Sequence, residues 1–358
     1  MDKLIIKGRG AGSNPDCRYQ SDNRETVDDE WYFDQTNKKI KTTVTRDTSK
    51  TIISKNNSPD VPFSHSLNPY RGCEHGCIYC FARPTHAYLD LSPGLDFETK
   101  LIIKPDAAML LEKALRAKNY QCMPLALGSN TDPYQPIERE YKLTRQVLEV
   151  LAEFNHPVAI ITKSALIERD IDILSEMARS DLVEVMISVC TLDKGIARTL
   201  EPRASSPSRR IKTIERLVAA NIPTGVLLAP MIPVLTEPEL ETIINIAVAA
   251  GAQKASYILL RLPLEVAPLF EEWVYTHYPL KADHILTRVR DTRAGKLYNS
   301  EFGTRMRGEG PYATMIGQRF DIACKNAGLL GQKVRRIVLD TDRFSVPERF
   351  IPQMSLFD

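Results

Sequence analysis

The chain has 358 residues, of which 43% are apolar, and this length fits one large α/β domain with extensions around a full core. Its formal net charge of +2 at pH 7 excludes a global electrostatic field that would attract nucleic acid. No run of 18 apolar residues occurs, and the apolar run at 4–6 is too short for a signal peptide, so we expect a cytoplasmic protein that does not enter a membrane.

Residues 1–63 form a polar segment in which basic and acidic residues are nearly balanced. The stretch TNKKIKTTVTRDTSK contains β-branched residues but little alternation of apolar and polar positions. We therefore interpret residues 1–63 as an extended N-terminal arm that is partly disordered. From about Ser64 the pattern changes to short apolar runs that alternate with amphipathic stretches, which is typical of βα units.

Six short apolar runs are predicted to be strands, at 65–70, 124–128, 157–162, 182–190, 222–229 and 255–262. Helical patterns separate them, at 105–118, 137–154, 166–179, 207–220 and 237–250. The alternation predicts an α/β fold with a parallel sheet, in the form of an open, partial (β/α)6 barrel over residues 64–280. Residues 281–332 are predicted to form a mainly helical C-terminal extension, and residues 333–358 a tail.

A group of cysteines lies in the motif NPYRGCEHGCIYCFARPTH at 68–86. Cys73, Cys77 and Cys80 form the pattern CxxxCxxC directly after the first predicted strand. The chain has 7 cysteines, and an odd number with this spacing suits a metal centre better than disulfides. Thiolates are the soft ligands of iron–sulfur clusters, and three of them leave one iron of a four-iron cluster open to a substrate or cofactor.

A zinc site is the alternative for the same cysteines, because His75 or His86 would complete a tetrahedral Cys3His set. His75 lies inside the loop, where its short tether makes it hard to bind the same ion as both flanking cysteines. The usual zinc pattern also brings a second, distant pair of ligands, which the sequence does not show. The iron–sulfur interpretation is therefore favoured, and a zinc-dependent interaction module is the non-enzymatic alternative.

The pattern CxxxCxxC with an aromatic residue, Tyr79, just before the last cysteine resembles the radical S-adenosylmethionine (SAM) superfamily, whose fold is a partial barrel. The resemblance implies a [4Fe-4S] cluster whose open iron binds SAM through its amino and carboxylate groups. It also implies reductive cleavage of SAM to a 5′-deoxyadenosyl radical that abstracts hydrogen from a substrate. A reductant such as flavodoxin or ferredoxin would supply the electron, and Tyr79 would contact the adenine of SAM.

Ligands of such barrels gather at the carboxyl ends of the strands, so the polar residues after each apolar run are candidates for the SAM site. The motif GSNTDPYQPIE follows the second strand, where the superfamily holds the SAM amino group, and offers Ser129, Asn130 and Asp132. Lys163 follows the third strand and would pair with the SAM carboxylate. An ion pair between Lys163 and a helix acid is the simpler structural explanation of this lysine.

The fourth strand ends with Ser188 and Thr191, which would meet the ribose hydroxyls of SAM. Beyond it, Arg198 is the candidate for contact with a carboxylate or phosphate. Arg209 and Arg210 follow a Ser-Pro helix start and are interpreted as solvated side chains.

Over about residues 66–262 the chain resembles the spore photoproduct lyase-like branch, through NPYxGCxHGCxYCFAR, GSxTDPYQPxE, SVxTLD with EPR, and APMIP. The fuller cysteine motif resembles a bacterial subgroup named DNA repair photolyases by similarity. This resemblance implies action on DNA, as repair or base modification, and the alternative substrate is a protein or small molecule.

One departure from that branch concerns the hydrogen donor. The lyase returns a hydrogen atom from a cysteine near the end of its second strand, where this chain reads LALGSNTD. Cys190 ends the fourth strand on the ligand side and is the candidate catalytic thiol, although a buried structural cysteine would explain it as well. Cys122 precedes the second strand and is interpreted as packing.

Two features of the C-terminal region suggest partners. Residues 281–358 carry 14 Lys and Arg against 9 Asp and Glu, which fits either a basic face that binds DNA or an ordinary solvated surface. The terminal Gln353, Met354, Ser355, Leu356 and Phe357 resemble the peptide with which bacterial repair enzymes bind the sliding clamp. We therefore expect a sliding clamp as a partner, and the alternative is an apolar pair folded back on the barrel.

Overall fold

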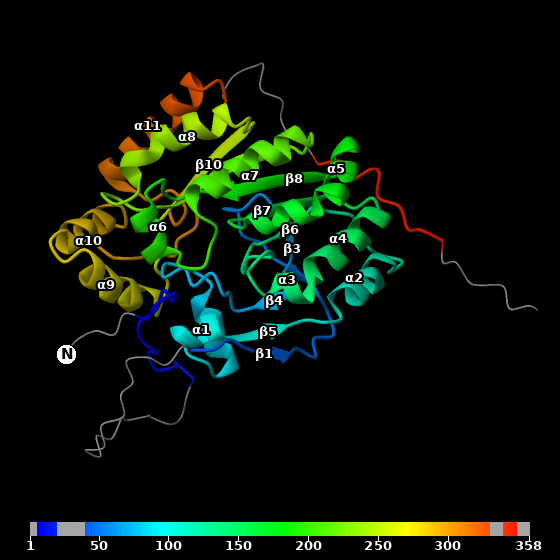
Figure 1. Cartoon of the computed structure of the whole chain (residues 1–358), viewed down its shortest axis with the longest axis horizontal. Coiled ribbons are helices and arrows are strands. Elements are labelled where there is room, and N and C mark those ends of the chain that lie inside the picture. Colours follow the sequence, from blue (N-terminus) through cyan, green and yellow to red (C-terminus); the bar gives the residue numbers. More distant parts are fainter. Residues whose placement is uncertain (1–5, 20–39, 330–338, 349–358) are drawn as a thin grey trace, which may run out of the picture.

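The computed structural model describes residues 6–19, 40–329 and 339–348. Its centre is a sheet with the strand order β10-β9-β8-β7-β6-β3-β2 (Figure 1). Neighbouring strands are parallel except for β2 (Ile53–Lys55), which runs antiparallel to β3. The parallel strands are β3 (His65–Leu67), β6 (Leu125–Leu127), β7 (Val158–Thr162), β8 (Val183–Ser188), β9 (Thr224–Met231) and β10 (Lys254–Leu259).

The six parallel strands overlap the six predicted strands, and the predicted partial (β/α) barrel is confirmed. A strand of a parallel sheet is buried on both faces, because helices cover one face and the barrel interior lies on the other. In β9, for example, the successive residues Val226, Leu227 and Leu228, which point alternately to the two faces, are 0%, 9% and 1% exposed. This double burial is why the strands read as continuous apolar runs in the sequence.

Helices alternate with the strands and cover the outer face of the sheet (Figure 1). They are α2 (Ala107–Leu115), α4 (Leu143–Glu153), α5 (Ile171–Arg179), α7 (Pro207–Ala219) and α8 (Leu240–Ala249). Each turns an apolar stripe inward, as in α7, where Ile211, Ile214 and Leu217 are buried.

Three predicted helices differ from the observed ones in detail. The stretch 137–154 is split at Lys142, which has a φ of 51°, into α3 (Glu138–Tyr141) and α4. The stretches 166–179 and 237–250 each begin with a 3-10 turn, η2 (Ala165–Asp170) and η3 (Glu237–Glu239).

A second, smaller sheet lies beside the barrel and carries the cysteine motif. Its order is β1-β5-β4, formed by β1 (Thr43–Arg46), β5 (Lys100–Ile103) and β4 (Tyr70–Arg71). Between β4 and β5 the chain forms the cysteine loop, the 3-10 helix η1 (Arg83–Leu89) and α1 (Leu95–Thr99). The predicted arm therefore contributes β1 and β2 to the two sheets, and its residues Ala11 and Cys17 are buried.

The region after β8 and β10 is helical. It contains α6 (Lys194–Leu200), α9 (Val266–His277), α10 (Ala282–Asp291) and α11 (Gly310–Asn326), and α11 packs on α8 (Figure 1). The two last helices agree with the predicted helical extension. Among the residues that the structure describes, no helix is long and apolar enough to cross a membrane. The predicted clamp-binding residues 353–357 lie outside the described residues.

Candidate active site

The three motif cysteines lie on the loop between β4 and η1. Cys73 and Cys77 are 7% and 6% exposed, and Cys80 is partly buried. Successive turns fold the loop back on itself, because Gly76 N donates to Cys73 O at 3.3 Å and Cys80 N to Cys77 O at 3.2 Å. Burial, the Asp132 carboxylate and the two neighbouring cysteines all raise the pKa of the Cys73 thiol. The three sulfur atoms therefore share one buried environment.

A buried ion pair between Arg83 and Glu98 stabilises the cysteine loop. Arg83 is 0% exposed, and its guanidinium donates to Cys77 O at 2.9 Å, to Gly94 O at 2.8 Å and to Glu98 Oε1 at 2.5 Å. Glu98 in turn accepts the backbone N–H groups of Gly10 at 3.0 Å and Ala11 at 2.9 Å. The pair thus ties the N-terminal segment to the cysteine loop.

Two close contacts complete the support of the loop. Gln135 donates to Gly72 O at 3.1 Å and accepts from Glu74 N at 2.9 Å, which joins the loop to the segment after β6. Gly10 lies so close to the loop that a Cβ atom at this position would be 1.8 Å from Gly76 O. A side chain at residue 10 would therefore displace the loop.

The donor set decides which metal centre the loop fits. In the described part of the chain, no group of three or more His, Cys, Asp or Glu side chains is placed to hold a metal ion as it stands. His86 Nε2 lies 3.0 Å from Lys100 O, while His86 Nδ1 is buried without a hydrogen-bond partner, and His75 Nδ1 lies 3.4 Å from Asp132 Oδ2. A four-iron cluster binds each thiolate to a different iron, so three thiols spread around one loop fit it better than they fit zinc.

Asp132 connects the ends of the second and third barrel strands. Its Oδ1 accepts from Thr162 Oγ1 at 2.7 Å and Tyr134 N at 2.9 Å, and its Oδ2 accepts from Lys163 N at 3.0 Å. Burial acts to raise the pKa of this carboxyl, but His75 and Lys163 outweigh it and hold the pKa well below its usual range. With its oxygens occupied in this way, Asp132 is a buried anchor of the strand ends.

The other candidates after the second strand are more open. Ser129 and Asn130 are half-buried, and Asn68 holds both, through a 3.4 Å hydrogen bond to Ser129 Oγ and a 3.2 Å hydrogen bond from Asn130 N. Because Asn68 belongs to the cysteine motif, these contacts place the β6 segment beside the cysteine loop.

Lys163 lies at the end of β7, close to the cysteine loop. Burial acts to lower its pKa, but the charges of Cys77, Glu201 and Asp132 outweigh burial and raise the pKa above the usual lysine value. In the described residues, its ammonium group makes no ion pair with a helix acid, which was the simpler explanation of this lysine. Lys163 is therefore a cation at the strand ends that makes no ion pair with any described residue.

A buried network at the end of β8 includes Tyr79. The phenol donates to Glu201, which also pairs with Arg210. Arg210 and Glu201 are each 2% exposed, and Arg210 also donates to Ser188 O at 2.9 Å. The expectation that Arg210 is solvated is wrong, because it lies on the buried stripe of α7 that also carries Ile214 and Leu217. This helical periodicity is the signal that the sequence analysis missed.

The remaining candidates of the fourth strand have protein partners or lie at the surface. Ser188 Oγ donates to Ala229 O at 3.0 Å, and Thr191 donates to the Glu239 carboxylate. Arg198 is exposed on α6. Arg203 of the EPR motif, rather than Arg198, contacts the cysteine loop, and its Nη2 lies 3.2 Å from Glu74 Oε1.

Cys190 follows the carboxyl end of β8 by two residues. It is 3% exposed and packs in a core cluster with Ile78 and Leu200. Burial and the charge of Glu201 raise the pKa of its thiol. Cys190 is thus a protonated thiol between an apolar core and the charged network.

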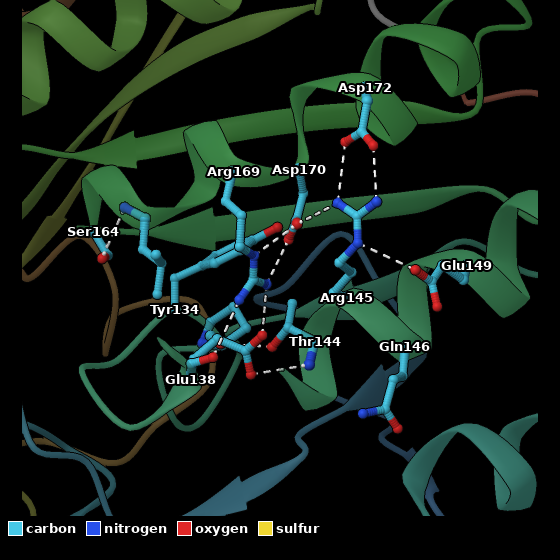
Figure 2. A network of polar contacts seen from close by, with 12 residues as sticks. Tyr134, Glu138, Thr144, Arg145, Gln146, Glu149, Ser164, Arg169, Asp170 and Asp172 are labelled. Carbon is cyan, nitrogen blue, oxygen red and sulfur yellow. Dashed lines mark hydrogen bonds and ion pairs between the residues drawn. The ribbon is translucent and has the colours of Figure 1, made fainter. Parts of the chain in front are cut away.

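Figure 2 shows the ion-pair network that holds the DPYQPIE part of the second motif. Glu138 accepts from Thr144 N at 3.1 Å and from Arg169 Nη2 at 2.7 Å, and Arg169 also pairs with Asp170 at 2.8 Å. Arg145 of α4 pairs with Asp170 at 3.0 Å and with Asp172 of α5 at 2.8 Å. These motif residues therefore position the segment that carries Ser129 and Asn130.

Comparison with known proteins defines the class. The family model described as the radical SAM superfamily matches residues 67–247, and the chain therefore belongs to this superfamily. It is a radical SAM enzyme with a fold like that of spore photoproduct lyase.

Individual relatives share this region. An uncharacterized protein of Mycobacterium tuberculosis is 36% identical over 237 residues, which cover 66% of this chain and 68% of that protein. An uncharacterized protein of Methanocaldococcus jannaschii is 27% identical over 174 residues, which cover 48% of this chain and 62% of that protein.

Solved structures of spore photoproduct lyase have the same fold. The lyase complexed with dinucleoside spore photoproduct matches with a TM-score of 0.58 and 14% identity, over 79% of each chain. A variant of the lyase with bound AdoMet and dinucleoside spore photoproduct matches with a TM-score of 0.55 and 13% identity, over 79% of this chain and 78% of that chain.

Proposed function

We propose that Cys73, Cys77 and Cys80 hold a [4Fe-4S] cluster, that SAM binds beside it, and that the enzyme acts on DNA. The observation that carries the proposal is the loop of three thiols beside the carboxyl ends of the parallel strands. The zinc-dependent module is disfavoured, because the sequence shows no second, distant pair of ligands of the usual zinc pattern.

The residues around the loop support SAM binding. When bound, the reduced cluster supplies the electron that cleaves SAM to methionine and a 5′-deoxyadenosyl radical. Lys163 is the cation for the SAM carboxylate, because it is charged and makes no ion pair within the described part of the chain. Ser129 and Asn130 offer oxygen acceptors for the amino group, and Tyr79 offers its ring to the adenine. Ser188, Thr191 and Arg198 stay weaker candidates, because the first two hydroxyls already donate to protein groups and Arg198 is exposed.

The proposed substrate is DNA, in repair or base modification. The fold is that of an enzyme solved with dinucleoside spore photoproduct, and the cysteine motif resembles that branch. Cys190 is the proposed hydrogen donor, because it is a protonated thiol near the ends of the strands. A protein or small molecule is the alternative substrate.

The segment boundaries, the cellular location and the electron donor are also proposals. We assign residues 1–63 to an arm, 64–280 to the barrel, 281–332 to the helical extension and 333–358 to a tail. A cytoplasmic enzyme of this class would draw its electrons from a flavodoxin or ferredoxin.

Anaerobic turnover tests the proposal. The protein is incubated with SAM and dithionite, with and without ultraviolet-irradiated DNA, and 5′-deoxyadenosine and repaired bases are measured. We expect about four irons per chain, SAM cleavage, and a loss of lesions that depends on both SAM and protein. Cys77→Ala should lose the iron and the cleavage, and Cys122→Ala should retain both. Iron and cleavage without any change in the DNA would reject the DNA substrate in favour of the alternative.

A further inference from the structure

The carboxyl end of β10 carries a guanidinium that contacts no acid among the residues that the structure describes. Arg261 follows β10 by two residues and is half-buried. Its Nη2 donates to the Tyr298 hydroxyl at 3.4 Å and its Nη1 to the Met306 sulfur at 3.6 Å, while Nε is buried without a partner. A phenol and a thioether are weak, neutral acceptors, so these contacts leave the positive charge uncompensated.

A second arginine strengthens the positive charge behind Arg261. Arg293 is 0% exposed and donates to Leu260 O at 2.7 Å and to Thr304 O at 3.0 Å, which ties the loop before α11 to the end of β10. Burial and the charge of Arg261 lower the pKa of Arg293 to about 10, so it stays protonated at neutral pH. Two arginines with neutral partners are unusual inside a protein, where such charges are normally paired.

An exposed aromatic ring lies beside Arg261. The guanidinium carbon of Arg261 is 5.0 Å from the ring centroid of Phe81, which is 42% exposed and directly follows Cys80. The exposed Arg307 of the loop before α11 lies 3.9 Å from the ring centroid of Tyr257 and 5.7 Å from that of Phe320. The acids of this loop are Glu301 and Glu309, and the Glu309 carboxylate accepts from Asn299 Nδ2 at 3.0 Å.

We propose that Arg261 and Phe81 form a contact site for a polynucleotide strand, in which Arg261 binds a phosphate next to the target nucleotide and the Phe81 ring stacks on a base. An uncompensated guanidinium suits a phosphodiester, and an exposed ring next to it suits a base face. The site deepens the proposed function, on which it rests, because Phe81 adjoins Cys80 and a base stacked there lies next to the proposed cluster. A nucleotide offers both a phosphate and a flat ring, which an acidic peptide does not.

Binding of a fluorescent single-stranded oligonucleotide to the full-length holoprotein tests the site, by anisotropy across a salt series without reductant. Arg261→Gln should weaken binding by about 10- to 100-fold and reduce the salt slope by about one. Phe81→Leu should weaken binding by about tenfold with an unchanged salt slope, because stacking releases no counterions. Arg179→Gln is the matched control, since Arg179 is an exposed arginine at the amino end of β8, and it should change binding less than twofold.

The outcomes separate this site from the proposed function. If the parent binds the oligonucleotide and Arg261→Gln binds it as well as Arg179→Gln does, the site is wrong and the DNA substrate stands. If the parent cleaves SAM but binds no oligonucleotide even at low salt, both the site and the DNA substrate are rejected. Equal displacement of the oligonucleotide by polyglutamate would reject a nucleotide-specific site. Arg261→Lys, which keeps the charge, should retain the parent's salt slope, and its failure to do so would contradict a phosphate contact.

Discussion

Replacing Glu98 with Gln should destabilise the cysteine loop, because this carboxylate is a buried charge with three donors. The side chains of Glu98 and Arg83 are both 0% exposed, and Nη2 of Arg83 lies 2.5 Å from Oε1. Gly10 N and Ala11 N donate to the same carboxylate at 3.0 Å and 2.9 Å. Glutamine has the same size and leaves no cavity, but it removes the charge opposite Arg83 and turns an N–H donor toward another donor.

The size of the effect follows from these contacts. Breaking one side of a buried ion pair costs about 3–5 kcal/mol, and an unpaired buried N–H costs about 1–3 kcal/mol. Arg83 keeps its hydrogen bonds to backbone carbonyl oxygens, among them Cys77 O and Gly94 O. We therefore expect the free energy of unfolding to fall by about 3–5 kcal/mol in total.

Urea unfolding of the metal-free protein measures this loss, and hydrogen exchange at residues 9–11 reports whether the N-terminal segment detaches. Iron content after anaerobic reconstitution shows whether the loop still assembles the centre, and we expect it to fall. The control is Glu149→Gln, because Glu149 is an exposed partner of Arg145 at 3.2 Å and its loss should cost less than about 1 kcal/mol. A Glu98→Gln protein that loses under about 1 kcal/mol and keeps its iron would refute the reasoning.

Four further predictions concern Lys163, Cys190, His156 and the C-terminal tail. Lys163→Met should weaken SAM binding by about 10- to 100-fold, because a charge-assisted hydrogen bond contributes about 1.5–3 kcal/mol. Equilibrium dialysis measures this affinity, and an unchanged value would assign Lys163 a structural role. Cys190→Ala should lower the product formed per 5′-deoxyadenosine while Cys122→Ala does not, and equal ratios would assign Cys190 to the core. Burial lowers the pKa of His156 to about 4, below the unfolded value of about 6.5, so the folded state resists protonation and stability falls as the pH drops from about 6.5 to 4. Urea unfolding at pH 7 and 5 should show a loss that is about 2 kcal/mol smaller in His156→Gln than in the parent, and an equal loss in both proteins would contradict this cause. The full-length protein should bind a sliding clamp with micromolar affinity, or about −8 kcal/mol. Truncation after Pro352 should abolish this binding without affecting SAM cleavage. A full-length protein that does not bind the clamp at tens of micromolar would exclude the motif.

Much of the fold could be predicted from local patterns. A parallel strand buried on both faces needs a continuous apolar run, so β7 and β8 were visible in the sequence without knowledge of their neighbours. The strand β1 was missed because its residues are polar or partly exposed. The strand β5 was missed although Leu101 and Ile103 are buried, because it has only 4 residues and pairs only within the second sheet. The exposure of the first of these strands gives no apolar alternation to detect.

The candidate site, like the fold, could be predicted only where its pattern is local in the sequence. The spacing of Cys73, Cys77 and Cys80 is local, so the sequence by itself determined a three-thiol loop after a strand, whatever surrounds it. The partners of the buried charges were decided only by the tertiary structure. Glu98 meets Gly10 and Ala11 across 88 and 87 residues, and no local pattern records such a contact. A charged side chain in a sequence shows its sign but not its burial, because burial depends on which distant backbone groups the fold brings to it.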